Sequence, residues 1–277
     1  MYKVKVEILC AAMHQKDLSK YKEMNIQTDM VLANQDNRYE YVEEKINNNM
    51  VKMITTPYRG VGKNRNTALL HSSGDILMFS DDDIVYVDGY AEGVVKAFEE
   101  LPDADMIVFN CIKHSNNSRG RIGKVSRVRL WNFMRYGTVS FVIKKEAVLK
   151  YNLNFSQLFG GGSRYCSGED NLFLREALKK NLKVYSHPFT IAHINQGPST
   201  WFEGFNKKYF YDNGAWLQAA FPILRHLLVW YFVLKFAKKT NLSRMDTLRL
   251  QYSGMKAFKK GLSYDEWHLE KIPQSIM

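Results

Sequence analysis

Short apolar runs alternate with segments of helical periodicity over the first two thirds of the chain, and this pattern predicts an α/β sheet. The polar, glycine-containing residues 115–124 predict a loop between two such elements. Strands are expected at 3–12, 29–34, 50–55, 76–80, 105–112 and 139–143, and helices at 16–24, 64–71, 89–100 and 171–180.

The pattern changes near Thr200 and becomes helical, aromatic and then basic. Helices are expected at 201–220 and 223–236. The longest part of the second helix without Lys, Arg, Asp or Glu is 226–234, far short of the roughly 20 residues that span a bilayer. This helix is therefore a buried core helix or an interfacial one. We expect two domains, a catalytic one at 1–200 and a helical basic region at 201–277.

Three consecutive carboxylates, Asp81, Asp82 and Asp83, follow the buried strand at 76–80. Adjacent acids repel one another unless positive charge offsets them. At the carboxyl end of a strand in an open α/β sheet they lie where such folds bind ligands. Their hard oxygen ligands suit Mg²⁺ or Mn²⁺ carrying a nucleotide diphosphate. A solvated turn or a helix cap is the simpler alternative.

Three other segments carry candidate chemistry. A glycine turn at 59–62 leads into a helix start, where backbone N–H groups and Arg65 could face a diphosphate, although such turns often only cap a helix. Glycines at 160–162, with Gly161 in the middle, precede Glu169 and Asp170 at another helix start. His193 ends a short strand before a turn at 197–198 and is either structural or a metal ligand.

Composition restricts the partners. The formal net charge is +11, and residues 223–277 hold ten Lys/Arg against four Asp/Glu, a net +6. No nucleic-acid-binding motif accompanies these charges, so nucleic acid is not an expected partner. Cys10, Cys111 and Cys166 match no zinc pattern or disulfide framework, which favours a reducing compartment. The chain begins in a strand pattern without a leader, so a cytoplasmic location is expected.

The four segments together resemble the family 2 glycosyltransferases of GT-A fold over residues 3–200. The resemblance implies a Rossmann-like mixed sheet flanked by helices, with a helical C-terminal extension. It also implies a nucleoside site at 9–12, including Ala11, and at Asp36. Residues 10–13 read Cys-Ala-Ala-Met, where the family usually has Pro-Thr-Tyr-Asn.

The resemblance also implies the roles of the acids. Asp83 would bind the metal, Asp81 would lie close to the ribose and sugar and assist, and His193 would complete the ligand set. Asp82 and Gly161 would contact the donor. Asp170 would be the catalytic base, with Glu169 assisting in acceptor placement.

The implied function is an inverting transfer of a hexose that depends on Mn²⁺ or Mg²⁺. The donor would be a nucleotide-diphospho-sugar, a UDP-sugar, and the acceptor a hydroxyl of a glycan or lipid-linked chain in surface polysaccharide synthesis. Two alternatives are a nucleotidyltransferase and a binding protein of the same fold without turnover.

Peripheral contact with the inner face of the cytoplasmic membrane is expected through an aromatic set bordered by basic residues. The set comprises Trp216, Phe221, Leu227, Leu228, Trp230, Tyr231, Phe232 and Phe236, and the basic residues are Arg225, Lys235, Lys238, Lys239 and Arg244.

Overall fold

The structure is a computed structural model that describes residues 4–113, 121–195 and 203–269. The chain divides into two compact units. The first unit consists of Met1–Ser156 and Asp170–Pro198, and the second of Gln157–Glu169 and Ser199–Met277. The glycine-rich segment that precedes Asp170 thus groups with the C-terminal helices.

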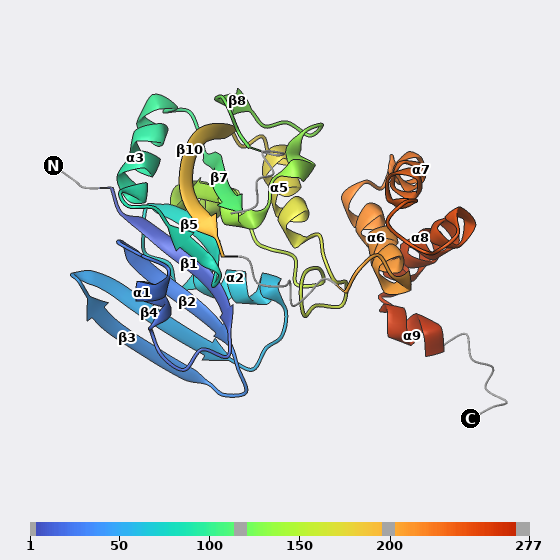
Figure 1. Cartoon of the computed structure of the whole chain (residues 1–277), viewed down its shortest axis with the longest axis horizontal. Helices are drawn as coiled ribbons and strands as arrows, with labels where there is room; N and C mark the ends of the chain where they lie inside the picture. Colours follow the sequence, from blue (N-terminus) through green and yellow to red (C-terminus); the bar gives the residue numbers. More distant parts are fainter. Residues whose placement is uncertain (1–3, 114–120, 196–202, 270–277) are drawn as a thin grey trace. The chain divides into compact units, whose positions relative to one another are not determined.

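Ten strands of the described residues form one mixed sheet in the first unit, in the order β3-β4-β2-β1-β5-β9-β7-β10-β6, with β8 paired to β10 (Figure 1). The strands are β1 (Val6–Met13), β2 (Asp29–Gln35), β3 (Glu40–Ile46), β4 (Asn49–Thr56), β5 (Ile76–Asp81), β6 (Ile84–Tyr86), β7 (Met106–Lys113), β8 (Ser126–Arg127), β9 (Phe141–Lys144) and β10 (Val184–Ile194). The pairs β1–β2, β1–β5 and β2–β4 are parallel, so four carboxyl ends meet at one edge.

Helices cover both faces of this sheet. Strand β1 is buried along nearly its whole length, as expected for a parallel strand covered on both sides. Its residues Ile8 and Cys10 join a core with Tyr21 and Tyr90. Helix α2 packs against β1 and β2, α3 against β10 and α4 against β9. The helices of this unit are α1 (Lys20–Glu23), α2 (Val61–Leu70), α3 (Tyr90–Glu100), α4 (Lys145–Lys150) and α5 (Glu169–Lys179), with short 3₁₀ turns η1 (Phe133–Arg135) and η2 (Thr138–Ser140).

The predicted strands are confirmed, with small changes at their ends, as β1, β2, β4, β5, β7 and β9. The predicted helix at 16–24 is wrong in its first half, because Asp17 Oδ1 accepts a hydrogen bond from Ser19 N and holds the preceding residues in a loop. The sequence does not predict β3, since four of its seven residues are charged. Residues 115–120 of the predicted loop, and the predicted turn at 197–198, lie outside the described residues.

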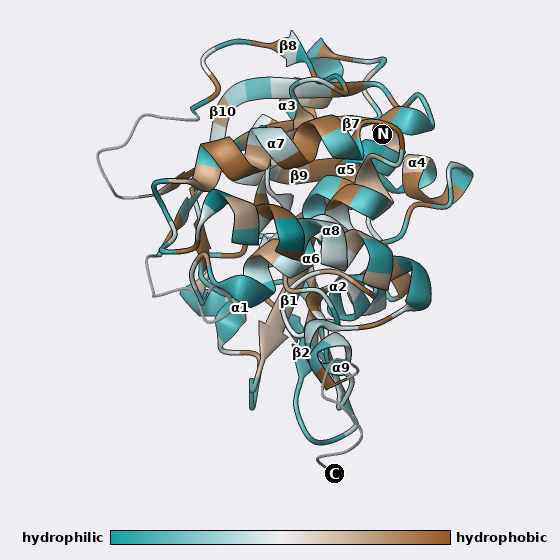
Figure 2. Cartoon of the chain, turned by 90° about the vertical axis from the view of Figure 1, so that its right-hand side faces the viewer, coloured by the Kyte–Doolittle hydropathy of each residue, from teal (hydrophilic) through white to brown (hydrophobic). Residues whose placement is uncertain are grey.

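The second unit contains helices α6 (Lys207–Ala220), α7 (Arg225–Phe236), α8 (Arg244–Lys260) and α9 (Tyr264–Leu269). The predicted helix at 201–220 begins only at α6, where Asn206 Oδ1 accepts from Tyr209 N and caps the first turn. Within the described part of the chain, no helix has the length and apolar character needed to cross a bilayer. Much of α7 is nevertheless hydrophobic (Figure 2).

Helices α6 and α8 cross in close contact at two glycines. A Cβ atom at Gly214 would lie 2.0 Å from Gln251 O, and one at Gly254 would lie 1.9 Å from Tyr211 O. Both neighbours are backbone atoms, which cannot move away by a side-chain rotation. The crossing therefore depends on the absence of side chains at these positions.

We predict that Gly254→Ala lowers the free energy of unfolding by about 1–3 kcal/mol, the usual range for overpacking. Gly123→Ala is the matched control, because its added methyl group would meet nothing within 4 Å. Denaturant unfolding of both variants measures the difference. Equal stability of the two would contradict the close crossing.

Candidate active site

The three carboxylates lie at the carboxyl edge of the central strands. Strand β5 is buried through Ser80 and ends at Asp81, and Asp82 and Asp83 form the turn into β6. In the parallel pair β1–β5, Asp81 stands opposite Ala11. The structure therefore brings Ala11 and the acids together at the edge where open α/β sheets bind ligands.

Arg65 places a buried positive charge beside the first carboxylate. Its side chain is 5% exposed, and its Nη2 donates to Asp81 Oδ1 at 2.9 Å. The guanidinium also lies over the Phe155 ring, 5.4 Å from the centroid. Asn64, one residue earlier on α2, donates from Nδ2 to Ala12 O at 3.0 Å and to Ala33 O at 2.8 Å. This amide ties the start of α2 to the ends of β1 and β2.

Asp82 lies in a partly desolvated position. Gln15 Nε2 donates to Asp82 Oδ2 at 3.2 Å and to Met13 O at 2.8 Å. Burial raises the pKa of the Asp82 carboxyl; the charge of Lys20 lowers this pKa, and the charge of Asp81 raises it further. The folded chain therefore favours the protonated form of Asp82 more strongly than an exposed position would.

His193 lies on the strand that pairs with the acid-bearing turn. Strand β10 runs antiparallel to β6, with His193 opposite Val85, and Asn195 N donates to Asp83 O at 2.9 Å. Among the described residues, no three His, Cys, Asp or Glu side chains converge as a ready metal cage. Carboxylate oxygens are nevertheless the ligands that Mg²⁺ prefers, and Mg²⁺ usually binds through one or two carboxylates, phosphates and water. The donor set fits such an ion, and the metal-binding roles stay a prediction.

Asp170 belongs to the same edge of the first unit. Its Oδ1 accepts from Asn171 N at 2.6 Å, and its Oδ2 would lie 3.8 Å from a Cβ atom at Gly137. Gly137 precedes η2, which contacts β5 and leads into β9. A second carboxylate thus stands near the end of β5 on a separate element.

An aromatic cluster holds α5 against the sheet. Phe173 of α5 stacks on Phe155 with centroids 4.2 Å apart, and Phe79 of β5 meets both rings edge-on at 5.0 and 5.6 Å. The Phe155 ring therefore contacts both the Arg65 guanidinium and α5, the helix on which Asp170 lies.

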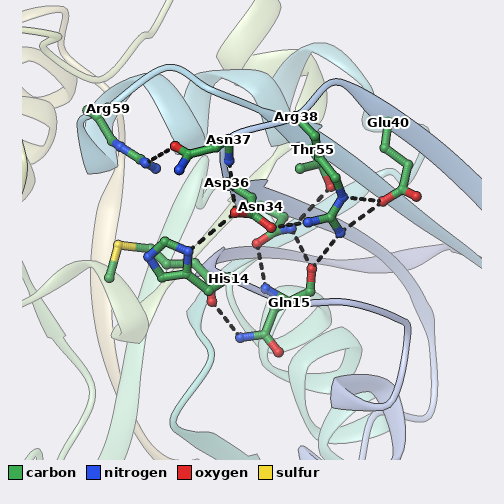
Figure 3. A network of polar contacts seen from close by, with 10 residues as sticks. His14, Gln15, Asn34, Asp36, Asn37, Arg38, Glu40, Thr55 and Arg59 are labelled. Atoms are coloured by element: carbon green, nitrogen blue, oxygen red, sulfur yellow. Dashed lines mark hydrogen bonds and ion pairs between the residues drawn. The ribbon is translucent and has the colours of Figure 1, made fainter.

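A polar network joins the ends of β1, β2 and β4 around Asp36 (Figure 3). Asp36 pairs with Arg38, whose Nη2 donates to Gln15 O at 2.9 Å. Asn34 Nδ2 donates to the same oxygen at 2.9 Å. His14, with a positive φ of 57°, places Nδ1 3.5 Å from Asp36 Oδ1. The sequence predicts Asp36 here but misses the other four residues, whose only signal is their position at or just after the ends of β1 and β2.

Two predicted residues belong to the second unit. Glu169 is the first residue of α5 and is grouped with that unit. Gly161 lines a cavity of about 220 Å³ whose wall includes Cys166 and Lys208. Lys208 Nζ is 2.6 Å from Oδ2 of Asp212, a carboxylate that is 1% exposed. The predicted contacts of Gly161 and Glu169 with substrates stay predictions.

Residues 33–182 match the family model described as glycosyl transferase family 2, which is 150 of 277 residues. The chain belongs to glycosyl transferase family 2. The chain is accordingly a glycosyltransferase, which confirms the predicted family and enzyme class. No protein of curated function gives a significant sequence match.

Solved structures show the same fold. The crystal structure of S. aureus TarS 1–349 in complex with UDP-GlcNAc has a TM-score of 0.57 at 12% identity, over 98% of this chain and 77% of that one. The complex of TarS 1–349 with UDP has a TM-score of 0.58 at 12% identity, over 94% and 93%. These matches confirm the predicted GT-A fold with its mixed sheet, flanking helices and C-terminal helices.

We predict that Asp82→Asn raises the Tm at neutral pH in the absence of divalent cations. The pKa of Asp82 in the folded chain is raised above its ordinary value of 3.8. Protonated Asp82 therefore stabilises the fold at pH values below 3.8, and this stabilisation is lost as the pH rises through the raised pKa. The ionised carboxylate therefore opposes folding at neutral pH, and the uncharged amide removes that effect.

Thermal unfolding of both proteins across a pH series measures the effect. The Tm difference should shrink as the pH falls towards 3.8. A difference that is independent of pH would contradict the assignment to the charge of Asp82.

Proposed function

We propose that the chain is an inverting, metal-dependent glycosyltransferase that moves a hexose from a UDP-sugar to a hydroxyl of a glycan or lipid-linked acceptor in surface polysaccharide synthesis. The observation that carries the proposal is the placement of two separate carboxylate groups at one sheet edge: the Asp81 group held by Arg65, and Asp170 on α5. Such a reaction needs one group to bind the donor and another to accept a proton. The proposal includes a cytoplasmic location with peripheral contact at the inner face of the membrane.

The choice of donor is supported by the fold neighbours. The TarS structures are complexes with UDP-GlcNAc and with UDP. In the present chain the network around Asp36, at the ends of β1 and β2, offers hydrogen-bonding groups for a nucleoside. Ala11 would line the floor of this site, since it is a small buried residue of β1 that stands opposite Asp81.

Each step of the transfer can be assigned to residues at this edge. Asp170 would accept the proton of the acceptor hydroxyl, whose oxygen then bonds to the anomeric carbon of the donor. The bond from that carbon to the diphosphate oxygen breaks, and its electron pair leaves with UDP. Attack from the face opposite the diphosphate inverts the anomeric centre.

Asp83, with Asp81 and His193, would hold the metal. A bound Mn²⁺ or Mg²⁺ would stabilise the negative charge that develops on the departing diphosphate. Arg65 would orient Asp81 for this task, because the Arg65 side chain is buried, pairs with Asp81 and lies over the Phe155 ring.

The experiment that tests the proposal is nucleotide release. Purified full-length chain is incubated with UDP-, GDP- and dTDP-sugars, with Mn²⁺, Mg²⁺ or a chelator, and free nucleoside diphosphate is measured. UDP release that needs a divalent cation supports the proposal. Release of pyrophosphate, or no release from any donor, would contradict it.

We predict that Asp83→Ala abolishes the metal-dependent part of UDP binding and leaves the fold intact. The substitution removes the proposed direct ligand but no residue of the buried core. Calorimetric titration of UDP with and without Mn²⁺ measures the loss. Glu44→Ala, at an exposed acid of the edge strand β3, is the control and should bind like the parent chain. Unchanged Mn²⁺-dependent affinity in Asp83→Ala would show that the metal lies elsewhere.

We predict that Asp170→Asn lowers turnover by about 10²–10⁴-fold, the usual contribution of general base catalysis, while UDP-sugar affinity is kept. The amide can still accept the hydrogen bond from Asn171 N but cannot accept a proton. Steady-state kinetics with donor titration separate the two effects. Glu169→Gln should be milder, and a more damaging Glu169→Gln would reverse the two roles.

A further inference from the structure

Helix α7 has two apolar faces, and only one of them is covered. Val229, Phe232, Val233 and Phe236 are buried within the described residues. A second row on the same helix is exposed, which we call the outer stripe. The outer stripe consists of Leu227, Trp230, Tyr231 and Leu234, which are 70%, 51%, 50% and 61% exposed. Ile223, in the turn before the helix, is 88% exposed.

The spacing of the outer stripe matches one side of a helix. Positions 227, 230 and 234 are separated by three and four residues, so their side chains follow one line along α7. The outward side of a surface helix ordinarily carries charged or polar residues. A continuous row of large apolar side chains in their place marks an interaction surface.

The predicted aromatic set is thereby divided. Trp216, Phe232 and Phe236 are each 7% exposed and belong to the core of the second unit. Leu227, Trp230 and Tyr231 face outward.

The charged residues next to the outer stripe in the sequence are all basic. Residues 213–245 contain no Asp or Glu and five Lys or Arg. Lys235, Lys238 and Lys239 follow the end of the stripe and are exposed. Lys235 Nζ lies 5.4 Å from the centroid of the Tyr231 ring, so its stem runs along the apolar side chains. An apolar row bordered by cations fits an anionic surface that also offers apolar depth.

We propose that the outer stripe of α7 inserts into the interface of an anionic lipid bilayer, with Lys235, Lys238 and Lys239 at the level of the headgroups. The helix has 12 residues, about 18 Å in length, which suits a helix lying in the membrane plane and not one that spans it. A second copy of the chain is the weaker occupant, because the lysines that follow the stripe in the two copies would repel each other.

The outer stripe would be the surface through which the proposed glycosyltransferase contacts the membrane, so this inference rests on the proposed function. Its test needs no turnover. A chain that binds vesicles but releases no UDP would refute the function alone. A chain that releases UDP but binds no vesicles would refute the inference, and with it the proposed membrane contact, but not the transfer reaction.

The experiment is sedimentation of the full-length chain with vesicles of phosphatidylcholine, with and without phosphatidylglycerol, at low and high salt. The parent chain should sediment with the anionic vesicles at low salt, and salt should weaken the binding. The stripe variant Leu227→Ser/Trp230→Ser should lower the partition coefficient by tenfold or more. The charge variant Lys235→Gln/Lys238→Gln/Lys239→Gln should lower it by about fivefold per residue at low salt.

The control variant is Leu70→Ser/Leu149→Ser, which removes two apolar side chains from the first unit that are 82% and 70% exposed, at least as exposed as Leu227 and Trp230. It should bind vesicles like the parent chain. All three variants change exposed residues and should keep the parent Tm.

Three results would overturn the inference. The parent chain could stay in solution with anionic vesicles at low salt. The stripe variant could bind as tightly as the parent chain. Sedimentation equilibrium could show a dimer that only the stripe variant dissociates, which would assign the outer stripe to a second copy.

Discussion

The ion pair between Arg65 and Asp81 is the interaction on which the rest of the site depends. Adjacent carboxylates at the end of a buried strand repel one another and lose hydration, and a nearby positive charge offsets part of this cost. Arg65 supplies that charge from a side chain that is 5% exposed. A guanidinium suits this position because it stays charged when buried and can stack on an aromatic face.

The position of Arg65 is in turn fixed by packing on several sides. Asn64 ties α2 to the ends of β1 and β2 through two backbone carbonyls. A Cβ atom at Gly62 would lie 2.0 Å from Ser156 O, so α2 approaches the segment around Phe155 closely. Phe155 then stacks on Phe173 of α5. The proposed donor-binding acids and the proposed base are therefore linked through one packed group of residues in the first unit.

Much of this arrangement could be predicted from the sequence, and the reasons for the failures are physical. Strands such as β1 and β5 are buried on both faces, so they read as apolar runs, and the acids after β5 mark a strand end. Strand β3 is stabilised by pairing with β4 at the sheet edge. Its charged residues leave no apolar pattern from which a strand could be predicted. His14, Gln15 and Arg38 come together because of the register in which β1 and β2 pair. This register cannot be predicted from the residues on either side of each position. The two faces of α7 could not be separated either, because apolar residues occur on both and only packing on neighbouring helices covers one.

The central claim is that the edge formed by β1, β2 and β5 binds a metal together with a nucleoside diphosphate. The most direct measurement is the Tm of the parent chain with UDP alone, Mn²⁺ alone and both together. A ligand that binds the folded state raises the Tm by mass action. The account predicts a larger rise with both than the sum of the separate rises, because each would complete the binding site of the other. A Tm that is unchanged by UDP, with or without Mn²⁺, would contradict it.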